Sequence, residues 1–555
     1  MKNNIVENIS NGKLTKEKFF KSNLFLVLLF VIFGSLPWYG ITPLSQFVMF
    51  VPLLMLQERS GGVKFMNWSV VALILWNFSS LWWIGNATIL GPLAAAFATT
   101  TLMSIVLNLY NRVWLNATRP LAYTVLVAGW VAAEWFYAKN LEISFPWINL
   151  GNGFGITPSF VQWYEYTGAL GGTLWVMVVN IIIFEGLKEC KKYDFKNILA
   201  SKKLLFALIF IVAPIIYSLV VYHTYKIDYK GSKAINVAVL QPNIDPYGEK
   251  FGSLSQNEQL NILLELAREA KGSNVDFFIA PETALDNDFW VHTVQSSLPV
   301  EKIESFLREN QPKADFITGL VIRQYYSKKE FDSAPTFTSR TTPNLPFYYD
   351  SYNSAISISD GEKIELYHKS RLAIGVEMMP FYRYTRNLGD FFVDLGGQFG
   401  MYATQDERTL LTNETTGVKV GCAICFESVY GEFITQFINK GAEALFIITN
   451  DGWWKDTPGY RQHLSFASLR AIETRREIAR SANTGISAII DSRGDILEHT
   501  LWDERTLLEA TIKTNDKITV YVKYGDYIGR LSAYIFVLSL LYAVSYYYKR
   551  RNHLV

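Results

Sequence analysis

The segment VKVGCAICFE occupies residues 418–427 and ends an apolar run in a thiol and a carboxylate. Its β-branched and small apolar residues favour a buried strand over 418–424. Cys425 follows this strand directly, and Glu427 follows two places later. Because catalytic groups in α/β folds collect at the carboxyl ends of strands, the segment indicates a reactive thiol in an α/β domain.

Two further apolar runs end in ionisable side chains. The run FFIAPE, residues 277–282, closes on Glu282, and the run LYHK, residues 366–369, closes on Lys369. A carboxylate can act as a base, an ammonium can stabilise an oxyanion, and a thiol is a strong nucleophile. Each residue alone is more often a turn carboxylate, a surface cation or a small buried hydrophobe. Their combination predicts acyl chemistry through a cysteine thioester.

Short apolar runs alternate with amphipathic stretches in the part of the chain that follows residue 234. We expect strands at 235–240, 275–279, 316–321, 355–359, 418–424, 444–449 and 487–491, and helices at 257–271 and 460–481. Alternation of this kind predicts an α/β layered fold.

Long apolar runs dominate the rest of the chain. Half of the 555 residues are hydrophobic and only 18% are charged. A helix needs about 20 apolar residues to cross the hydrocarbon layer. Stretches near that length lie at 23–39, 44–56, 68–84, 89–110, 121–137, 160–186, 204–222 and 531–548. We therefore expect an α-helical transmembrane bundle of about eight spans, although 44–56 is short and is alternatively a re-entrant segment.

Basic residues gather in alternate loops between these runs. They occur before the first run, in the second, fourth and sixth loops, and after the last run. Since Lys and Arg are retained on the cytoplasmic side, both termini are expected inside and the long segment after the seventh run outside. The sequence thus divides into a transmembrane region at 1–223, an extracytoplasmic catalytic domain at 224–528, and a C-terminal transmembrane helix with a cytoplasmic tail at 529–555.

The surroundings of Glu282, Lys369 and Cys425 resemble those of the carbon-nitrogen hydrolase (nitrilase) superfamily, whose αββα sandwich uses a Glu-Lys-Cys triad. Further motifs narrow the likeness: QPNI at 241–244, GVEMMPF at 375–381 and TNDGWW at 449–454. With seven apolar runs before the domain and one after it, nearly the whole chain is similar to the apolipoprotein N-acyltransferases, a family of bacterial membrane enzymes.

That resemblance implies a reaction and its participants. A phospholipid would donate an acyl chain to Cys425, and the α-amino group of a diacylglyceryl-modified cysteine at the N-terminus of an apolipoprotein would accept it. No cofactor is expected. The resemblance also implies a location in the bacterial inner (cytoplasmic) membrane, with the catalytic domain on the periplasmic side. Both substrates are lipids, and withdrawing a chain from the bilayer costs about 0.8 kcal/mol per CH₂, so the site must come to the membrane.

The resemblance also assigns roles to single residues. Glu282 would be the general base, and Lys369 with the backbone N–H of Phe426 would stabilise the oxyanion. Glu377, eight residues past Lys369, is expected to orient Lys369 or Glu282. Glu427 is expected to shape the pocket or hold the amine. Phe426 lacks the hydroxyl of the Tyr that the family often has at this position.

Two stretches are expected to lie near the membrane surface. Residues 391–401 are apolar and contain glycine, and we interpret them as an arm dipping toward lipid, with ordinary core packing as the alternative. The fifth loop, 144–155, is rich in aromatic residues and glycines. It lies either beneath the catalytic domain or in an interfacial aromatic belt.

Charge and cysteine spacing argue against several other classes. The net charge of +2 does not favour a nucleic-acid partner. Three cysteines are too few for a disulfide framework. Cys422 and Cys425 are spaced C-x-x-C, but the second pair of a zinc site and the helix start of a redox pair are missing, so Cys422 is assigned to the core. His368 and His463 have no partners at metal-ligand spacing, and no metal is expected.

Two other functions remain open from the residues alone. A membrane-tethered amidase or nitrilase would use the same triad with water in place of the amine, although a single span would tether it. A transporter or receptor with an extracytoplasmic binding domain would place ionisable residues at mid-membrane. The apolar runs contain few such residues, and Glu134 and Glu165 are the exceptions.

Overall fold

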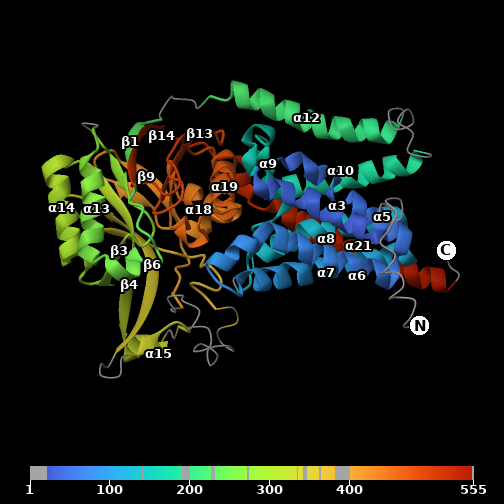
Figure 1. Ribbon diagram of the computed structural model, residues 1–555, viewed down its shortest axis with the longest axis horizontal. Coiled ribbons are helices and arrows are strands. Elements are labelled where there is room, and N and C mark those ends of the chain that lie inside the picture. Colours follow the sequence, from blue (N-terminus) through green and yellow to red (C-terminus); the bar gives the residue numbers. More distant parts are fainter. Residues whose placement is uncertain are drawn as a thin grey trace, which may run out of the picture.

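A bundle of helices carries an α/β domain at one end (Figure 1). The computed structural model describes residues 22–552 apart from 140–141, 191–200, 227–231, 272–273, 334–335, 342–346, 362–363, 380 and 382–400. The expected membrane arm, up to residue 400, therefore lies outside the described residues.

Among the described residues, six helices are long and apolar enough to cross a membrane. They are Gly62–Asn86 (α6 with η3), Gly91–Asn116 (α7), Arg119–Lys139 (α8), Ala169–Glu189 (α10), Lys202–Thr224 (α12) and Tyr527–Arg551 (α21). The apolar helix Asn23–Tyr39, made of α3 and η1, is shorter. The long candidate spans thus number six, against about eight expected from the sequence.

The stretch expected as the second span forms short helices instead of one long helix. They are η2 (Pro43–Ser45), α4 (Gln46–Met49) and α5 (Val51–Ser60). Gln46 adjoins Gly153 at the end near the catalytic domain. At the other end, Glu58 accepts hydrogen bonds from Arg119 at 2.6 Å and Lys188 at 2.5 Å. The segment therefore leads from the loop beneath the catalytic domain toward the opposite end of the bundle, and it is not among the six long candidate spans.

The break between α4 and α5 has a local cause. Pro52 has no N–H to donate within a helix. The N–H of Phe50 donates to the side-chain oxygen of Asn180 on α10, at 2.7 Å. This bond ties the break to the neighbouring helix.

The α/β domain contains two sheets. One has the strand order β14-β1-β2-β4-β6-β5, with β3 beside β4 and β7 beside β6, and the other has the order β13-β12-β11-β10-β9-β8. The strands of the first sheet are β1 (Ala234–Gln241), β2 (Phe277–Ile279), β3 (Leu285–Trp290), β4 (Asp315–Ser327), β5 (Arg340–Thr341), β6 (Phe347–Ile358), β7 (Glu365–His368) and β14 (Thr506–Lys513). Those of the second are β8 (Leu411–Asn413), β9 (Val418–Ile424), β10 (Ala444–Thr449), β11 (Ile478–Ala482), β12 (Ala488–Ile490) and β13 (Ile496–His499).

The alternation of side chains along β1 explains the layers. Val237 and Val239 belong to the core between the two sheets, whereas Ala238 and Leu240 face a second core against α13 (Gln256–Arg268) and α14 (Leu298–Asn310). Successive side chains of a strand point to opposite faces, so one strand serves both cores. Helices α18 (Gly431–Asn439) and α19 (Pro458–Thr474) cover the other sheet, which gives the expected αββα sandwich (Figure 1).

One predicted helix was too long. The helix expected at 460–481 ends at Thr474, because Arg475 adopts the left-handed conformation with φ 53°. Residues Ile478–Ala482 then form β11, which lies between β10 and β12 in the sheet. The apolar residues after Arg475 are therefore those of a fully buried strand, whose pattern resembles that of a buried helix.

The fifth loop of the bundle forms the floor on which the catalytic domain sits. Trp147 is fully buried, and its indole N–H donates to Gln462 of α19 at 2.7 Å. Gln462 in turn donates to the carbonyl of Trp38 at 2.7 Å. Arg475 of the catalytic domain forms an ion pair with Glu165 of the bundle at 3.0 Å. The loop is thus a layer beneath the domain and not an exposed aromatic belt.

Candidate active site

Glu282 lies in the turn that follows β2, three residues beyond the strand end. Glu282 is 7% exposed. The neighbouring strand β4 approaches this turn through Gly319, where an added Cβ would lie 2.3 Å from the backbone nitrogen of Thr283 and 2.7 Å from Cα of Glu282. Only glycine leaves room for that approach, so β4 fixes the position of the carboxylate.

Lys369 follows β7 and is held by two carboxylates. Its ammonium lies 2.8 Å from Glu282 and 2.9 Å from Glu377, and its residue is 1% exposed. Its backbone N–H donates to the carbonyl of Asn353 on β6 at 2.8 Å. The two carboxylates offset the desolvation cost of the buried ammonium, whereas an isolated buried ammonium would destabilise the fold.

Asn353 completes this arrangement, although no sequence pattern pointed to it. Its side-chain amide donates to Glu282 at 2.8 Å and to Glu377 at 2.6 Å. Glu377 also accepts from the backbone N–H of Ala373 at 2.7 Å. The predicted strand at 355–359 stopped short of Asn353, whereas β6 begins at Phe347. Asn353 was therefore missed because the predicted strand began two residues after it.

Cys425 lies in the sharp turn between β9 and the one-turn helix η10 (Cys425–Val429). Its φ of 50° is in the left-handed region, which a side chain with a Cβ adopts only at a cost. The thiol donates a hydrogen bond to Glu282, and the residue remains partly exposed. The structure therefore brings the three predicted triad residues together.

The charges of this cluster favour a neutral thiol beside an ionised base. Burial alone would raise the pKa of Glu282, but the Lys369 ammonium and its hydrogen bond lower it below the ordinary value. Burial opposes a charge on Lys369, yet Glu282 and Glu377 raise its pKa well above the ordinary value. Burial and the Glu282 charge raise the pKa of the Cys425 thiol well above its ordinary value. Proton transfer from thiol to carboxylate must then accompany attack on a substrate.

Glu427 is enclosed by donors and does not line an open space. One carboxylate oxygen accepts from the Tyr367 hydroxyl at 2.7 Å and from the backbone N–H groups of Ser370 at 2.6 Å and Arg371 at 3.2 Å. The other accepts from the N–H of Ile424 at 2.9 Å. The side chain thus ties the loop after Lys369 to the end of β9.

Phe426 packs against the floor of the domain. Its ring stacks on Phe145 at 5.6 Å and on Trp147 at 6.2 Å between centroids, and it meets Tyr430 edge-on at 5.4 Å. The tyrosine hydroxyl donates to Ser144 of the fifth loop at 3.0 Å. The residue after the nucleophile therefore anchors the catalytic turn to the membrane bundle.

Cys422 is fully buried within β9, as expected for a core residue. Within the described part of the chain, no group of three or more His, Cys, Asp and Glu residues has the arrangement of a metal site.

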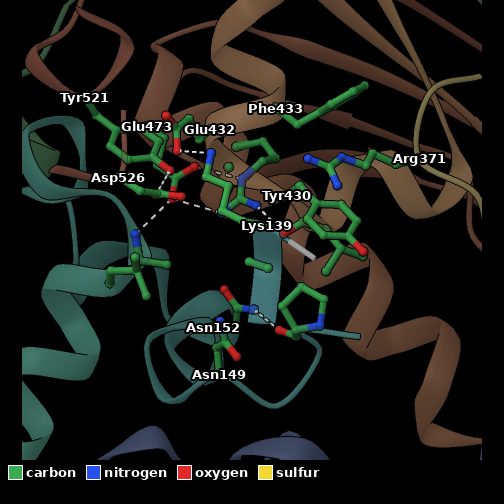
Figure 2. Close-up of a pocket in the computed structure, with 17 residues that line it drawn as sticks. Lys139, Asn149, Asn152, Arg371, Tyr430, Glu432, Phe433, Glu473, Tyr521 and Asp526 are labelled. Carbon is green, nitrogen blue, oxygen red and sulfur yellow. Dashed lines mark hydrogen bonds and ion pairs between the residues drawn. The ribbon is translucent and has the colours of Figure 1, made fainter. Parts of the chain in front are cut away.

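A separate polar cavity lies at the junction of the bundle and the domain (Figure 2). Glu432 of α18 forms ion pairs with Lys139, at the end of α8, and with Arg530 of α21 at 3.1 Å. Asp526, next to Glu432, accepts from the Tyr521 hydroxyl at 2.6 Å. Burial and the Glu432 charge raise the pKa of Asp526 to about 7. These groups join the helix ends to the catalytic domain.

The chain matches two family models over adjoining regions. Residues 236–519 match the carbon-nitrogen hydrolase family, and residues 27–182 match the apolipoprotein N-acyltransferase N-terminal domain. An apolipoprotein N-acyltransferase of Chlorobaculum tepidum is 27% identical over 545 residues, which cover 96% of this chain and 98% of that protein. Another, of Geobacter metallireducens, is 26% identical and covers 89% of each chain.

Solved structures match about half of this chain. A carbon-nitrogen hydrolase superfamily protein of Xanthomonas campestris is 14% identical, with a TM-score of 0.34, over 50% of this chain and 91% of that one. The hydrolase model covers the whole sandwich with its Glu-Lys-Cys cluster, and the N-terminal model covers most of the bundle beneath it. The chain therefore belongs to the carbon-nitrogen hydrolase family, as an acyltransferase of the apolipoprotein N-acyltransferase group.

Proposed function

We propose that this enzyme moves an acyl chain from a membrane phospholipid to the α-amino group of a diacylglyceryl-cysteine at the N-terminus of an apolipoprotein, through a thioester on Cys425. The observation that carries the proposal is the buried cluster of Glu282, Lys369 and Cys425 in a domain built onto the end of a membrane bundle. A thioester is an intermediate that an amine attacks readily, and both lipid substrates can reach such a site from the bilayer.

In the first half-reaction, the sulfur attacks the carbonyl carbon of the phospholipid ester while Glu282 takes the thiol proton. The oxyanion of the tetrahedral intermediate is stabilised by Lys369 and by the backbone N–H of Phe426. This N–H is the second of the helix η10, where the backbone donors lack partners within the helix. The C–O bond then breaks, and Glu282 returns the proton to the oxygen of the departing lysophospholipid.

In the second half-reaction, the amine nitrogen attacks the thioester carbon and loses a proton to Glu282. The C–S bond breaks, the proton goes to sulfur, and an amide remains on the acceptor. Glu377 keeps Lys369 in place throughout, since it contacts the ammonium at 2.9 Å. Glu427 supports the pocket from behind, as its four hydrogen bonds occupy both of its oxygens.

The proposal places the enzyme in the bacterial inner membrane, with the catalytic domain on the periplasmic face. The basic residues Arg119 and Lys188 lie together at the end of the bundle away from that domain, as the retention of positive charge inside requires. Labelling of single cysteines placed in the domain by a membrane-impermeant reagent in whole spheroplasts tests this orientation, and labelling only after lysis would contradict it.

Intact-protein mass spectrometry after incubation with phospholipid tests the chemistry. The wild type should gain one acyl chain that hydroxylamine removes, and Cys425→Ala should gain none. The matched control is Cys422→Ala, which changes the same residue type three residues earlier, within β9, and should still be acylated. The absence of an adduct from the wild type, when lipid is shown to reach the protein, would refute the thioester step.

The acceptor is tested separately with a synthetic diacylglyceryl-cysteine peptide. Transfer predicts a peptide that gains the mass of one acyl chain while the acyl-enzyme disappears. Release of free fatty acid at the same rate with and without the peptide would instead identify a membrane-tethered hydrolase.

A further inference from the structure

The backbone carbonyl of the nucleophile is held by two side chains from behind the active site. The Ser428 hydroxyl donates to the carbonyl oxygen of Cys425 at 2.8 Å, and Nε2 of His463 lies 3.1 Å from the same oxygen. Nε2 also lies 2.9 Å from the Ser428 oxygen. These contacts involve the backbone of the nucleophile and not its thiol, and neither Ser428 nor His463 belongs to the triad.

His463 is itself fixed by a buried ion pair. Its Nδ1 lies 3.0 Å from Asp451, and Asp451 forms an ion pair with Arg480 at 2.5 Å. Each of the three residues is at most 1% exposed. They come from three elements, since Asp451 follows β10, His463 lies on α19, and Arg480 lies on β11. The imidazole therefore has one orientation.

The same contacts decide where its proton lies. The Ser428 oxygen lies 2.8 Å from the Cys425 carbonyl oxygen and 2.9 Å from Nε2, so its hydroxyl can donate to either. A carbonyl oxygen only accepts, and Nε2 lies 3.1 Å from it. We therefore assign a proton to Nε2 of His463, which donates it toward the carbonyl, while Nδ1 faces Asp451 at 3.0 Å and the Arg480 guanidinium at 3.2 Å.

The carbonyl of Cys425 and the N–H of Phe426 belong to a single peptide unit. That unit is planar and trans, so its N–H points away from its carbonyl. Donors on the carbonyl fix the plane of the unit and strengthen the N–H as a donor at its other end, because hydrogen bonds in a chain polarise one another. In the proposed function, on which this step rests, that N–H stabilises the oxyanion.

We propose that His463, oriented by Asp451 and Arg480 and assisted by Ser428, is a positioning residue that sets and polarises the peptide donating to the oxyanion. His463 does not touch the substrate or the reacting atoms. It acts through the Cys425–Phe426 peptide, whose carbonyl it contacts and whose N–H faces the oxyanion in the proposed function.

Two amide substitutions of His463 separate this role from simple packing. In His463→Gln the amide nitrogen takes the place of Nε2 and can still donate to the Cys425 carbonyl, whereas in His463→Asn it takes the place of Nδ1 and cannot. Acylation of Cys425 by phospholipid should slow about tenfold in His463→Asn, less than the 10²–10³ that follows loss of a whole oxyanion donor, because the N–H is weakened and not removed. His463→Gln should recover most of the rate.

Alkylation of Cys425 by iodoacetamide is the second readout. The sulfur displaces iodide in one step without a tetrahedral oxyanion, so the alkylation rate should stay within about twofold of the wild type in both variants. Slow acylation with normal alkylation in His463→Asn, and recovery in His463→Gln, supports the proposal. A wild-type acylation rate in His463→Asn would refute it, and so would an equal loss of acylation and alkylation.

Ser428→Ala keeps the proposal testable if the histidine variants do not fold. It removes one donor from the Cys425 carbonyl and leaves the ion pair intact, so acylation should slow while alkylation does not. An unchanged acylation rate in Ser428→Ala would then overturn the proposal. A wild type that takes up no acyl chain would contradict the proposed function instead, which keeps the two failures distinct.

Discussion

Replacement of Glu282 by Gln should nearly abolish acylation at neutral pH and change its pH dependence. The ordinary pKa of 9.0 for the Cys425 thiol would leave about 3% thiolate at pH 7.5, and the raised pKa leaves less. Without an ionised base the rate depends on this fraction. We expect a loss of about 10²–10⁴-fold, which corresponds to about 3–5 kcal/mol of activation free energy.

The pH dependence distinguishes loss of the base from general damage. In the variant, acylation should rise about tenfold per pH unit as thiolate forms, whereas the wild type should not show this rise. Gln keeps an oxygen that accepts from Lys369, so the ammonium retains both neighbours. The assay is the time course of acyl-enzyme by intact mass, with Glu309→Gln, an exposed change on α14, as the control. Acylation of Glu282→Gln at the wild-type rate would refute the assignment of the base.

Three further outcomes are expected. The acylation rate of the wild type should be constant between about pH 6 and 9, because Glu282 is already ionised there. Lys369 lowers the pKa of Glu282 against the effect of burial. A rate that rises across this range would indicate attack by free thiolate. Gly319→Ala should slow acylation about 10²-fold without unfolding the domain, since its Cβ would force the turn of Glu282 to move; an unchanged rate would show that the turn adapts. Asp526 has a pKa raised to about 7, so the folded state binds its proton more tightly than the unfolded state and loses stability as pH rises from about 4 to 7. Asp526→Asn should therefore lose less Tm than the wild type between pH 5 and 8, and an equal loss would place the titrating group elsewhere.

The sequence was sufficient for those elements whose pattern is local. The strands predicted at 418–424 and 444–449 coincide with β9 and β10, and the residues at the strand ends, Glu282, Lys369 and Cys425, meet in space. A short apolar run followed by a reactive side chain suffices for such predictions, because parallel strands bring their carboxyl ends to one edge.

The partners contributed by distant elements were not predictable from the sequence. Asn353 occupies the middle of a long strand, where an amide gives no signal until Glu282 and Glu377 are known to flank it. His463 falls within a predicted helix and has no partner at metal-ligand spacing, yet in the fold its buried imidazole pairs with Asp451. The strand β11 itself was missed because its buried pattern continued that of α19.

The number of membrane crossings illustrates a different limit. Hydropathy detects long uninterrupted helices, but the stretch 44–56 forms short helices, with Asn180 accepting from the N–H of Phe50 at the break. Burial among other helices makes this possible, since an irregular backbone is tolerated at membrane depth only where protein surrounds it.

The floor beneath the catalytic domain limits what can be done with that domain as a laboratory reagent. If the chain were cut between α12 and β1, the Arg475 guanidinium would lose its Glu165 carboxylate and the Gln462 amide would lose both Trp147 and Trp38. A secreted fragment would present these groups and the neighbouring aromatic rings to water, and self-association would be the result. Obtaining a detergent-free version, for screening or for transplantation onto another anchor, therefore requires new side chains on α19 and at Arg475 before the helices are removed.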